Sequence, residues 1–434
     1  MGPDRADRFG IATLALLALG LVSTATADDW PQWRGPERDG RSAETGLLDN
    51  WPAGGPPLEW RASGLGSGFS SVAVAGERIY TLGDSGDAQY AVALDRKDGK
   101  QLWKTRVGPA WDDEYLGPRS TPTVDGKRIF VLSTEGDLFA IDAESGVTVW
   151  QRNLVKDFGG AMMKAMGQYE WKYSESPLVD GDRVVVTPGG KEAMMVALAK
   201  ATGEEIWRVA IPSLGEKGTD GAGYSSPVVS EAGGVRQYVQ FVGRGVIGVE
   251  AKTGRFLWGY NKVANDVANI PTPLVDGDRV FASSGYGTGS ALIELSRGDG
   301  GFSAREVYFL GPDTMQNHHG GLILHDGHVY AGSGHNKGLP VSVELATGKV
   351  AWGPERNDGQ ASAAIAYADG RLYFRYQNGL MVLVEATPEG YREHGSFTIP
   401  DVKRPSWPHP VIAGGKLYLR EQDHLYCYDV RARG

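Results

Sequence analysis

Cysteine is nearly missing from this chain. Among its 434 residues only Cys427 is a cysteine, so no disulfide can form within the chain. Cys427 lies in the alternating segment LYCYDV, which favours a small buried side chain over a redox-active thiol. A disulfide-stabilised fold is therefore excluded, and the core must come from packing.

Clusters of basic residues are missing as well. Lys and Arg number 44 against 53 Asp and Glu, which gives a formal net charge of −9 at pH 7. Nucleic-acid binding depends on gathered cations that release counterions from the phosphate backbone. The composition thus argues against DNA or RNA as a partner.

Long apolar runs are limited to one segment near the N-terminus. Arg5 and Arg8 precede an apolar run at 11–22, and small residues lead up to Ala27. This order is typical of a cleaved secretory signal. We expect a signal peptide at 1–27, cleavage after Ala27, and a periplasmic or secreted chain without a transmembrane span. The run is shorter than a membrane-spanning helix requires; an uncleaved anchor remains the alternative.

Signatures of hydrolytic catalysis are absent too. The sequence has no G-x-S-x-G elbow, no H-E-x-x-H and no phosphate-binding loop. The segment GYGTG (285–289) resembles a phosphate loop only in composition, because no helix is predicted after it.

A repeat occupies most of the chain instead. Its first half joins two apolar runs through Asp-Gly or a similar pair, a pattern typical of two-residue hairpin turns. This half is found at 74–80, 124–130, 179–185, 275–281, 325–330, 368–374 and 413–419, with a degenerate copy at 230–238. Each copy predicts two neighbouring inner strands.

The second half of the repeat is an alternating strand, a glycine-containing turn and a strand that ends on tryptophan. Trp103, Trp150, Trp207 and Trp258 are 47, 57 and 51 residues apart, so each unit can supply one four-stranded blade. Units five and seven lack the tryptophan, and Phe309 and Phe397 fall near its place.

Eight hairpins can be counted, and the last unit has no second half. The segment 56–62, which ends in Trp60-Arg61-Ala62, is an unassigned strand at the other end of the chain. We predict an all-β, eight-bladed propeller of four-stranded antiparallel blades at 56–434, with the ring closed by this N-terminal strand. Closure of this kind leaves no free sheet edge between the first and last blades.

An arm rich in Trp, Pro and Gly, at 28–55, precedes the predicted propeller. We expect Trp30 and Trp33 to plug a groove on the propeller. A tail that docks onto a partner is the alternative.

The half-repeat A-x-D-x-x-T-G-x-x-x-W, as in Ala93 to Trp103, resembles the tryptophan-docking motif of the quinoprotein propeller superfamily over about 57–430. In one branch, the pyrroloquinoline quinone (PQQ) alcohol dehydrogenases, the resemblance implies a quinone held between a tryptophan and a disulfide of adjacent cysteines, with a calcium ion. This chain has no adjacent cysteines. The other branch is similar to the BamB-type periplasmic propellers, which bind proteins. The arm and repeats together resemble secreted PQQ-like repeat proteins of planctomycete-type bacteria.

A propeller places two sets of loops around one mouth of its central channel: the loops that lead into the innermost strands, and the turns between the second and third strands. Polar and aromatic residues in such loops favour a binding site on a rigid scaffold. The predicted ligand-binding residues are Arg119, Glu175, Tyr224, Asn269, His318, His319, Trp407 and His409 from the first set, and His335 and Asn336 from the second.

Histidines gather in this part of the sequence, since all eight lie between 318 and 424. Imidazole is a common zinc or copper ligand and a near-neutral proton carrier. His318, His319 and His335 are the candidate metal ligands; hydrogen bonds to loop carbonyls are the alternative role. On an extended strand, neighbouring side chains point in opposite directions, so we expect only one of His318 and His319 to face His335.

The long segment 155–175 contains Met162, Met163 and Met166, which predict a short helix across the mouth. It is either a lid over a ligand or a packing insertion. Trp171 and Tyr173 would offer flat surfaces to a sugar or another ring.

These patterns favour a binding scaffold over an enzyme. A protein, a small molecule or a glycan would bind at the mouth of a monomeric propeller. The alternative is a PQQ-dependent or metal-dependent oxidoreductase that uses the same face. No cofactor is firmly implied, although PQQ or a metal ion would suit the alternative.

Overall fold

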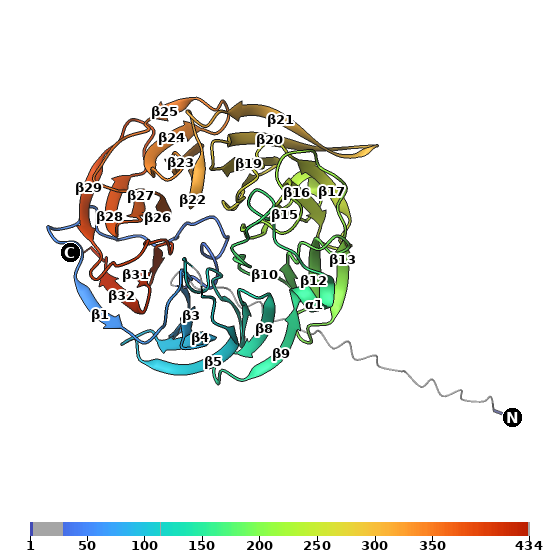
Figure 1. Cartoon of the computed structure of the whole chain (residues 1–434), viewed down its shortest axis with the longest axis horizontal. Helices are drawn as coiled ribbons and strands as arrows, with labels where there is room; N and C mark the ends of the chain where they lie inside the picture. The colour runs from blue at the N-terminus through green and yellow to red at the C-terminus, as the bar shows by residue number, and fades with distance from the viewer. Residues whose placement is uncertain (3–28, 113, 433–434) are drawn as a thin grey trace.

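A computed structural model describes residues 1–2, 29–112 and 114–432. Most of the predicted signal peptide, with its cleavage point after Ala27, lies outside them. Eight four-stranded antiparallel sheets stand around a central channel (Figure 1). The predicted eight-bladed, all-β propeller is confirmed.

Each of the first four blades is one continuous stretch of chain. Blade 1 consists of β2 (Ala73–Ala75), β3 (Arg78–Ser85), β4 (Ala88–Asp95) and β5 (Gln101–Pro109). Blade 2 consists of β6 (Thr123–Asp125), β7 (Arg128–Leu132), β8 (Asp137–Asp142) and β9 (Thr148–Asn153). Blade 3 consists of β10 (Leu178–Asp180), β11 (Arg183–Val186), β12 (Met195–Ala199) and β13 (Glu205–Val209). Blade 4 consists of β14 (Val228–Ser230), β15 (Gln237–Val242), β16 (Gly245–Glu250) and β17 (Phe256–Tyr260), with the short helix η1 (Ala232–Gly234) between β14 and β15.

The remaining blades follow the same order, except for the last. Blade 5 consists of β18 (Leu274–Asp276), β19 (Arg279–Ser284), β20 (Gly289–Gly298) and β21 (Gly301–Leu310). Blade 6 consists of β22 (Asn317–His325), β23 (His328–Ser333), β24 (Leu339–Glu344) and β25 (Val350–Trp352). Blade 7 consists of β26 (Ala363–Ala368), β27 (Arg371–Tyr376), β28 (Leu380–Glu385) and β29 (Glu393–Thr398). Blade 8 consists of β30 (Val411–Ala413), β31 (Lys416–Glu421), β32 (His424–Asp429) and β1 (Leu58–Ala62).

The two ends of the chain close the ring. Strand β1 pairs antiparallel with β32, so that Trp60 lies opposite Cys427. The predicted closure of blade 8 by the N-terminal strand is thus confirmed. Cys427 is buried within this sheet at 1% exposure, which matches the expectation of a small core side chain.

The repeated tryptophans hold neighbouring blades together. The ring of Trp150 lies against Gly203 of the next blade, where an added Cβ would come within 2.8 Å of the indole. Its Nε1 donates a hydrogen bond to the carbonyl of Lys200, at 3.0 Å. Trp103 and Trp207 make the same contacts one blade away, with Gly146 and Gly254. The glycine in this turn of the repeat is therefore required, because the indole of the neighbouring blade occupies the space that a side chain would need.

Blade 5 uses a tyrosine in place of the tryptophan, but one residue before the position that the sequence suggested. Tyr308, not Phe309, lies over Gly348 of blade 6, and its hydroxyl donates to the carbonyl of Leu345 at 2.7 Å. The pairing of β20 with β21 has a register shift between Leu292 and Ile293 that places Tyr308 opposite Leu292. The same shift in blade 3 places Trp207 opposite Ala197, so Tyr308 occupies the equivalent position to the tryptophan.

The N-terminal arm crosses the middle of the ring (Figure 1, blue) and bonds to turns between first and second strands, at Gly76, Asp369 and Gly414, which lie at the end of the blades away from the predicted mouth. Trp30, which is 2% exposed, exchanges two backbone hydrogen bonds with Val74, near the turn between β2 and β3. The guanidinium of Arg38 donates to the carbonyls of Ser176 and Pro177 in blade 3. Further along, Trp51 packs against Phe397 of blade 7. The arm thus touches blades on both sides of the channel.

The helix predicted around Met162, Met163 and Met166 is wrong. The structure has a one-turn helix earlier in the segment, α1 (Leu154–Phe158), which ends at Gly159 in the left-handed conformation. Beyond it, the backbone of Ala161 and Met163 bonds to neighbouring segments rather than to itself: Met163 donates to Ala222 at 2.9 Å. Met162 and Met163 are buried, so this stretch is a packing insertion.

No helix in the described residues is long and apolar enough to cross a membrane.

Candidate functional site

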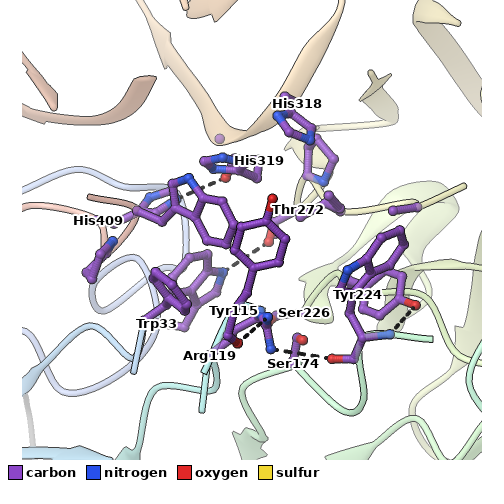
Figure 2. A pocket seen from close by; sticks show the side chains of 18 of the residues that line it. Trp33, Tyr115, Arg119, Ser174, Tyr224, Ser226, Thr272, His318, His319 and His409 are labelled. Atoms are coloured by element: carbon purple, nitrogen blue, oxygen red, sulfur yellow. Dashed lines mark hydrogen bonds between the residues drawn. The ribbon is translucent and has the colours of Figure 1, made fainter. Parts of the chain in front are cut away.

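A cavity of about 340 Å³ lies in the central channel on the side of the predicted mouth (Figure 2). Eight of the ten predicted residues line it: Arg119, Tyr224, His318, His319, His335, Asn336, Trp407 and His409. Loops of several blades therefore converge on one concave site, as the order of the repeat led us to expect.

Glu175 and Asn269 do not line this cavity. Both are buried behind its wall, where they satisfy backbone groups. The amide of Thr187 and the side chain of Gln240 donate to the Glu175 carboxylate, at 2.6 and 2.9 Å, and burial raises the Glu175 pKa to about 7. Asn269 donates to the carbonyls of Val242 and Gly243. These two polar side chains therefore stabilise the packing of the blades and do not form part of the cavity surface.

A cluster of rings forms one side of the cavity. His318 lies between Tyr286 and Ser362: its Nε2 is 3.0 Å from the Tyr286 hydroxyl and its Nδ1 is 2.6 Å from the Ser362 hydroxyl. The ring of His335 is 4.5 Å from that of His318, centroid to centroid. Burial lowers the pKa of His318 to about 2 and also lowers that of His335. These imidazoles are neutral hydrogen-bonding groups at physiological pH.

His318 and His319 both face the cavity, contrary to the expected alternation. Their ring centroids are 4.6 Å apart. The pairing of β22 with β23 is interrupted between Asn317 and Leu322, and Gly321 has a φ of +78°. Within such an interruption successive side chains need not alternate. The N-H-H-G-G segment thereby delivers two imidazoles to the same side.

His409 links the mouth to the N-terminal arm. Its Nε2 is 3.2 Å from the carbonyl of His319, and its Nδ1 is 3.5 Å from the guanidinium of Arg34. The indole of Trp33 lies 4.5 Å from the His409 ring and donates to the Thr272 hydroxyl at 3.1 Å (Figure 2). Burial, assisted by Arg34, lowers the His409 pKa to about 3.

Aromatic faces make up much of the remaining wall. Trp407 packs between Phe69 and Tyr115, with centroids 4.5 and 4.9 Å away. Across the cavity, the backbone N–H of Trp171 donates to the hydroxyl of Tyr224 at 3.1 Å (Figure 2). Tyr173, which we expected beside Trp171, points into the core instead and donates to a backbone carbonyl. Flat apolar surfaces of this kind suit rings.

Arg119 brings a cation to this wall. Its guanidinium lies over the indole of Trp111, 4.3 Å from the ring centroid. It donates to the carbonyls of Tyr115 and Trp171, at 3.0 and 3.4 Å (Figure 2). A stacked guanidinium of this kind is oriented before a ligand arrives.

Several lining residues were not predicted as part of the site. Trp33 and Arg34 come from the arm; Trp33 was expected to plug a groove on the propeller, but the path of the arm across the channel has no signal in the repeat. Ser226 and Thr272 also line the cavity, and they had a signal: Ser or Thr followed by Pro precedes innermost strands at 121–122, 176–177, 226–227 and 272–273. His409 occupies the matching place before Pro410.

The residues present do not fit the quinone and calcium site that the quinoprotein resemblance implies. That site needs a disulfide of adjacent cysteines, whereas the single cysteine is buried in β32. Among the described residues that line the cavity there is no Asp or Glu. Nor does the described part of the chain contain a group of three or more His, Cys, Asp or Glu side chains that could hold a metal ion.

Comparisons with known proteins agree with the fold. Residues 87–354 match the family model described as Outer membrane protein assembly factor BamB. The Burkholderia pseudomallei protein of that name is 25% identical over 332 residues, which cover 74% of each chain. Polyvinylalcohol dehydrogenase from a Sphingopyxis species is 24% identical over 85% of this chain, but the match covers 59% of that longer protein.

Solved structures of proteins from this group also share the propeller fold. BamB from Moraxella catarrhalis superimposes with a TM-score of 0.54 at 14% identity, over 80% of this chain and 95% of that one. Quinohemoprotein alcohol dehydrogenase from Comamonas testosteroni reaches a TM-score of 0.63 at 13% identity, over 95% of this chain and 82% of that one. At these identities the likeness concerns the fold alone. Since the family match spans more than half of the sequence, the chain belongs to the BamB family of PQQ-like-repeat propellers.

Proposed function

We propose that this protein is a binding scaffold whose ligand occupies the cavity at the channel mouth. The observation that carries the proposal is the convergence of aromatic faces and neutral imidazoles from different blades around about 340 Å³. Ligand pockets combine apolar walls with a few convergent polar groups in this way. The rigid blades hold these groups in place without help from the ligand.

The site of action that we propose is the periplasm or the cell exterior, with the propeller acting as a monomer. The predicted signal peptide supports this location, as does membership in a family named for outer membrane protein assembly. The rim of the same cavity would serve a protein partner that inserts a side chain, and a small molecule or glycan would enter it whole.

Equilibrium dialysis against a small-molecule extract, read by mass spectrometry, tests the proposal. Wild-type protein should retain a compound that the variant His335→Ala does not. His328→Ala is a matched control, because His328 begins β23 and His335 follows its other end. Both variants should unfold within a few degrees of wild type, since loop-tip side chains contribute little to the core.

The proposal fails if neither a compound nor an added peptide library distinguishes wild type from His335→Ala. The same dialysis with Arg119→Ala provides a second comparison at the opposite wall. Loss of binding in both variants, with binding kept in His328→Ala, would place the ligand in the cavity.

A second candidate is an oxidoreductase that uses the same face. The similarity to polyvinylalcohol dehydrogenase favours it. The residues that line the cavity, however, do not match those that the quinone and calcium site requires. Incubation with PQQ and calcium, followed by gel filtration and an absorbance spectrum, decides between the two. Stoichiometric quinone that reduces an artificial dye in the presence of an alcohol would put the enzyme first.

A further inference from the structure

The positive charges at the cavity are balanced within the protein. Burial lowers the pKa of Arg34 to about 10, and the nearby Asp39 carboxylate opposes this shift. Arg119 has the same relation to Asp84: burial raises the pKa of that carboxyl group, and the Arg119 guanidinium opposes the rise. Both arginines therefore belong to the wall, and neither is left over for a charged ligand.

The histidines and tyrosines of the lining are uncharged at neutral pH. Burial lowers the pKa of these histidines and raises that of these tyrosines, namely His318, His319, His335, His409, Tyr115, Tyr224 and Tyr286. A charged ligand would lose its hydration in this cavity without gaining a counter-charge, which is costly. The cavity thus favours an uncharged ligand.

Two equivalent turns, each between the second and third strands of a blade, present side-chain amides to the cavity. Gln377 follows β27, and its Oε1 accepts a hydrogen bond from Nε1 of Trp407 at 2.9 Å. Asn336 lies between β23 and β24, and its Oδ1 accepts from the Ser362 hydroxyl at 3.5 Å. Because each oxygen is engaged, the NH2 groups are left as donors. The described residues supply no partner for either NH2 group.

His335 adds a third donor beside Asn336. The backbone N–H of Tyr286 donates to its Nδ1 at 3.4 Å. A neutral imidazole has one acceptor and one donor nitrogen, so the proton lies on Nε2. Among the described residues no group accepts a hydrogen bond from this Nε2.

Ser362 ties these donors to one place and fixes their direction. Its carbonyl accepts from the backbone N–H of Gln377 at 3.1 Å, and its hydroxyl donates to Asn336. Since that hydroxyl has only one proton, Nδ1 of His318 must donate to it, and Nε2 of His318 then accepts from Tyr286. The series of hydrogen bonds ends on N–H groups, so a ligand must bring acceptor oxygens.

Aromatic rings determine the shape of the space between these donors. Trp33, Tyr115, Trp171 and Trp407 line the cavity and are partly exposed. The volume of about 340 Å³ lies near the lower end of the range of about 300–1,000 Å³ that ligand pockets span, which suits a compact ligand. A sugar ring has apolar C–H faces that pack on aromatic rings and hydroxyl oxygens around its rim.

We propose, resting on the binding function above, that the ligand is an uncharged sugar ring. Its hydroxyl oxygens accept hydrogen bonds from His335, Asn336 and Gln377. One of its faces packs against Trp407, whose indole lies beside Gln377. A free sugar and the end unit of a glycan share this chemistry, and the experiment below separates them.

Isothermal titration calorimetry with glucose, galactose and mannose, each compared with its uronate, tests the proposal on the purified protein. At least one neutral sugar should bind about tenfold tighter than its uronate. The disaccharides cellobiose, lactose and mannobiose carry the same three sugars at their non-reducing ends. A disaccharide that binds about tenfold tighter than its sugar assigns the end of a glycan, and equal affinity assigns a free sugar.

Asn336→Asp and Gln377→Glu keep the side-chain oxygens that bond to Ser362 and Trp407 but remove the NH2 donors. Each variant should bind the sugar about tenfold more weakly than wild type. Asn50→Asp is the matched control, because its exposed side-chain oxygen accepts from His394 of blade 7. It should keep the wild-type affinity.

Three results would overturn the proposal: no binding of any sugar probe, a uronate that binds as tightly as its neutral sugar, or unchanged affinity in both amide variants. The dialysis experiment judges the binding function separately. A charged compound, or one without a sugar ring, retained there in a His335-dependent manner would refute the sugar while leaving the scaffold.

Discussion

A guanidinium nitrogen of Arg34 lies 3.5 Å from Nδ1 of His409, and this contact fixes the protonation of the imidazole. Because arginine can only donate, Nδ1 must accept, and the proton is left on Nε2. That nitrogen is 3.2 Å from the carbonyl of His319, to which it can donate. One neutral tautomer satisfies both contacts, whereas a second proton on Nδ1 would point at a cation.

His409→Phe should make the protein less sensitive to acid. The folded pKa of His409 is about 3 against an ordinary 6.5, so its neutral form is fully favourable above pH 6.5 and stability is lost as pH falls toward 3. One such group lowers the free energy of unfolding by about 1.4 kcal/mol per pH unit in that window. Phenylalanine keeps the contact with Trp33 but does not titrate.

Urea unfolding at pH 7, 6 and 5 measures this effect. Between pH 6.5 and 5 the variant should lose about 2 kcal/mol less than wild type. His328→Phe, at the first residue of β23, is the control. Equal slopes for wild type and His409→Phe would contradict the tautomer assignment.

Trp150→Ala should lower the free energy of unfolding by about 3 kcal/mol, the lower end for a large aromatic deletion, because the indole is half-buried. It removes the packing against Gly203 and the hydrogen bond to Lys200. Val149→Ala, on the opposite face of the same strand and 41% exposed, should change stability by about 0.5 kcal/mol or less. Chemical denaturation of both variants checks this, and similar losses would refute inter-blade docking.

Arg420→Met should weaken the closure of the ring. The buried guanidinium of Arg420, in blade 8, donates to the Thr81 hydroxyl at 3.1 Å and to the Gly66 carbonyl at 2.8 Å, both on the blade 1 side. Methionine fills similar space but leaves these buried acceptors unsatisfied, for a loss of about 3 kcal/mol. Arg61→Met breaks an exposed ion pair with Asp401 and should cost less than about 1 kcal/mol. A Tm for Arg420→Met equal to that of Arg61→Met would count against the closure role.

Tyr308→Phe should lower the free energy of unfolding by about 1 kcal/mol, since it deletes only the hydrogen bond to Leu345. Tyr308→Ala should lose about 3 kcal/mol because the ring packs on Gly348. If Phe309→Ala proves more damaging than Tyr308→Ala in thermal unfolding, the docking residue of blade 5 has been misassigned.

Hairpin turns and tryptophans predicted the fold because they are local requirements that recur in every blade. Tyr308 was missed because blade 5 has no T-G-x-x-x-W segment, so no motif marks the docking position in its sequence. Loop order predicted eight lining residues, since a propeller puts equivalent loops on the same face. Trp33 packs into the propeller as predicted, but neither its place in the cavity wall nor the contribution of Arg34 could be predicted, because the arm lies outside the repeat and only packing determines where it crosses. The methionine helix failed since Gly159 ends α1 and the backbone beyond it pairs with residue 222.

The pairing of Trp60 with Cys427 also bears on how the chain folds during synthesis. The ribosome makes β1 before any other strand of the ring and β32 after all of them. Until β32 emerges, β1 lacks its partner and blade 1 lacks the neighbour that supplies Arg420. Contacts this distant in sequence form slowly and late. A chain that stops before β32 would carry seven complete blades and an open sheet edge, so the ring can close only after its last strand has been made.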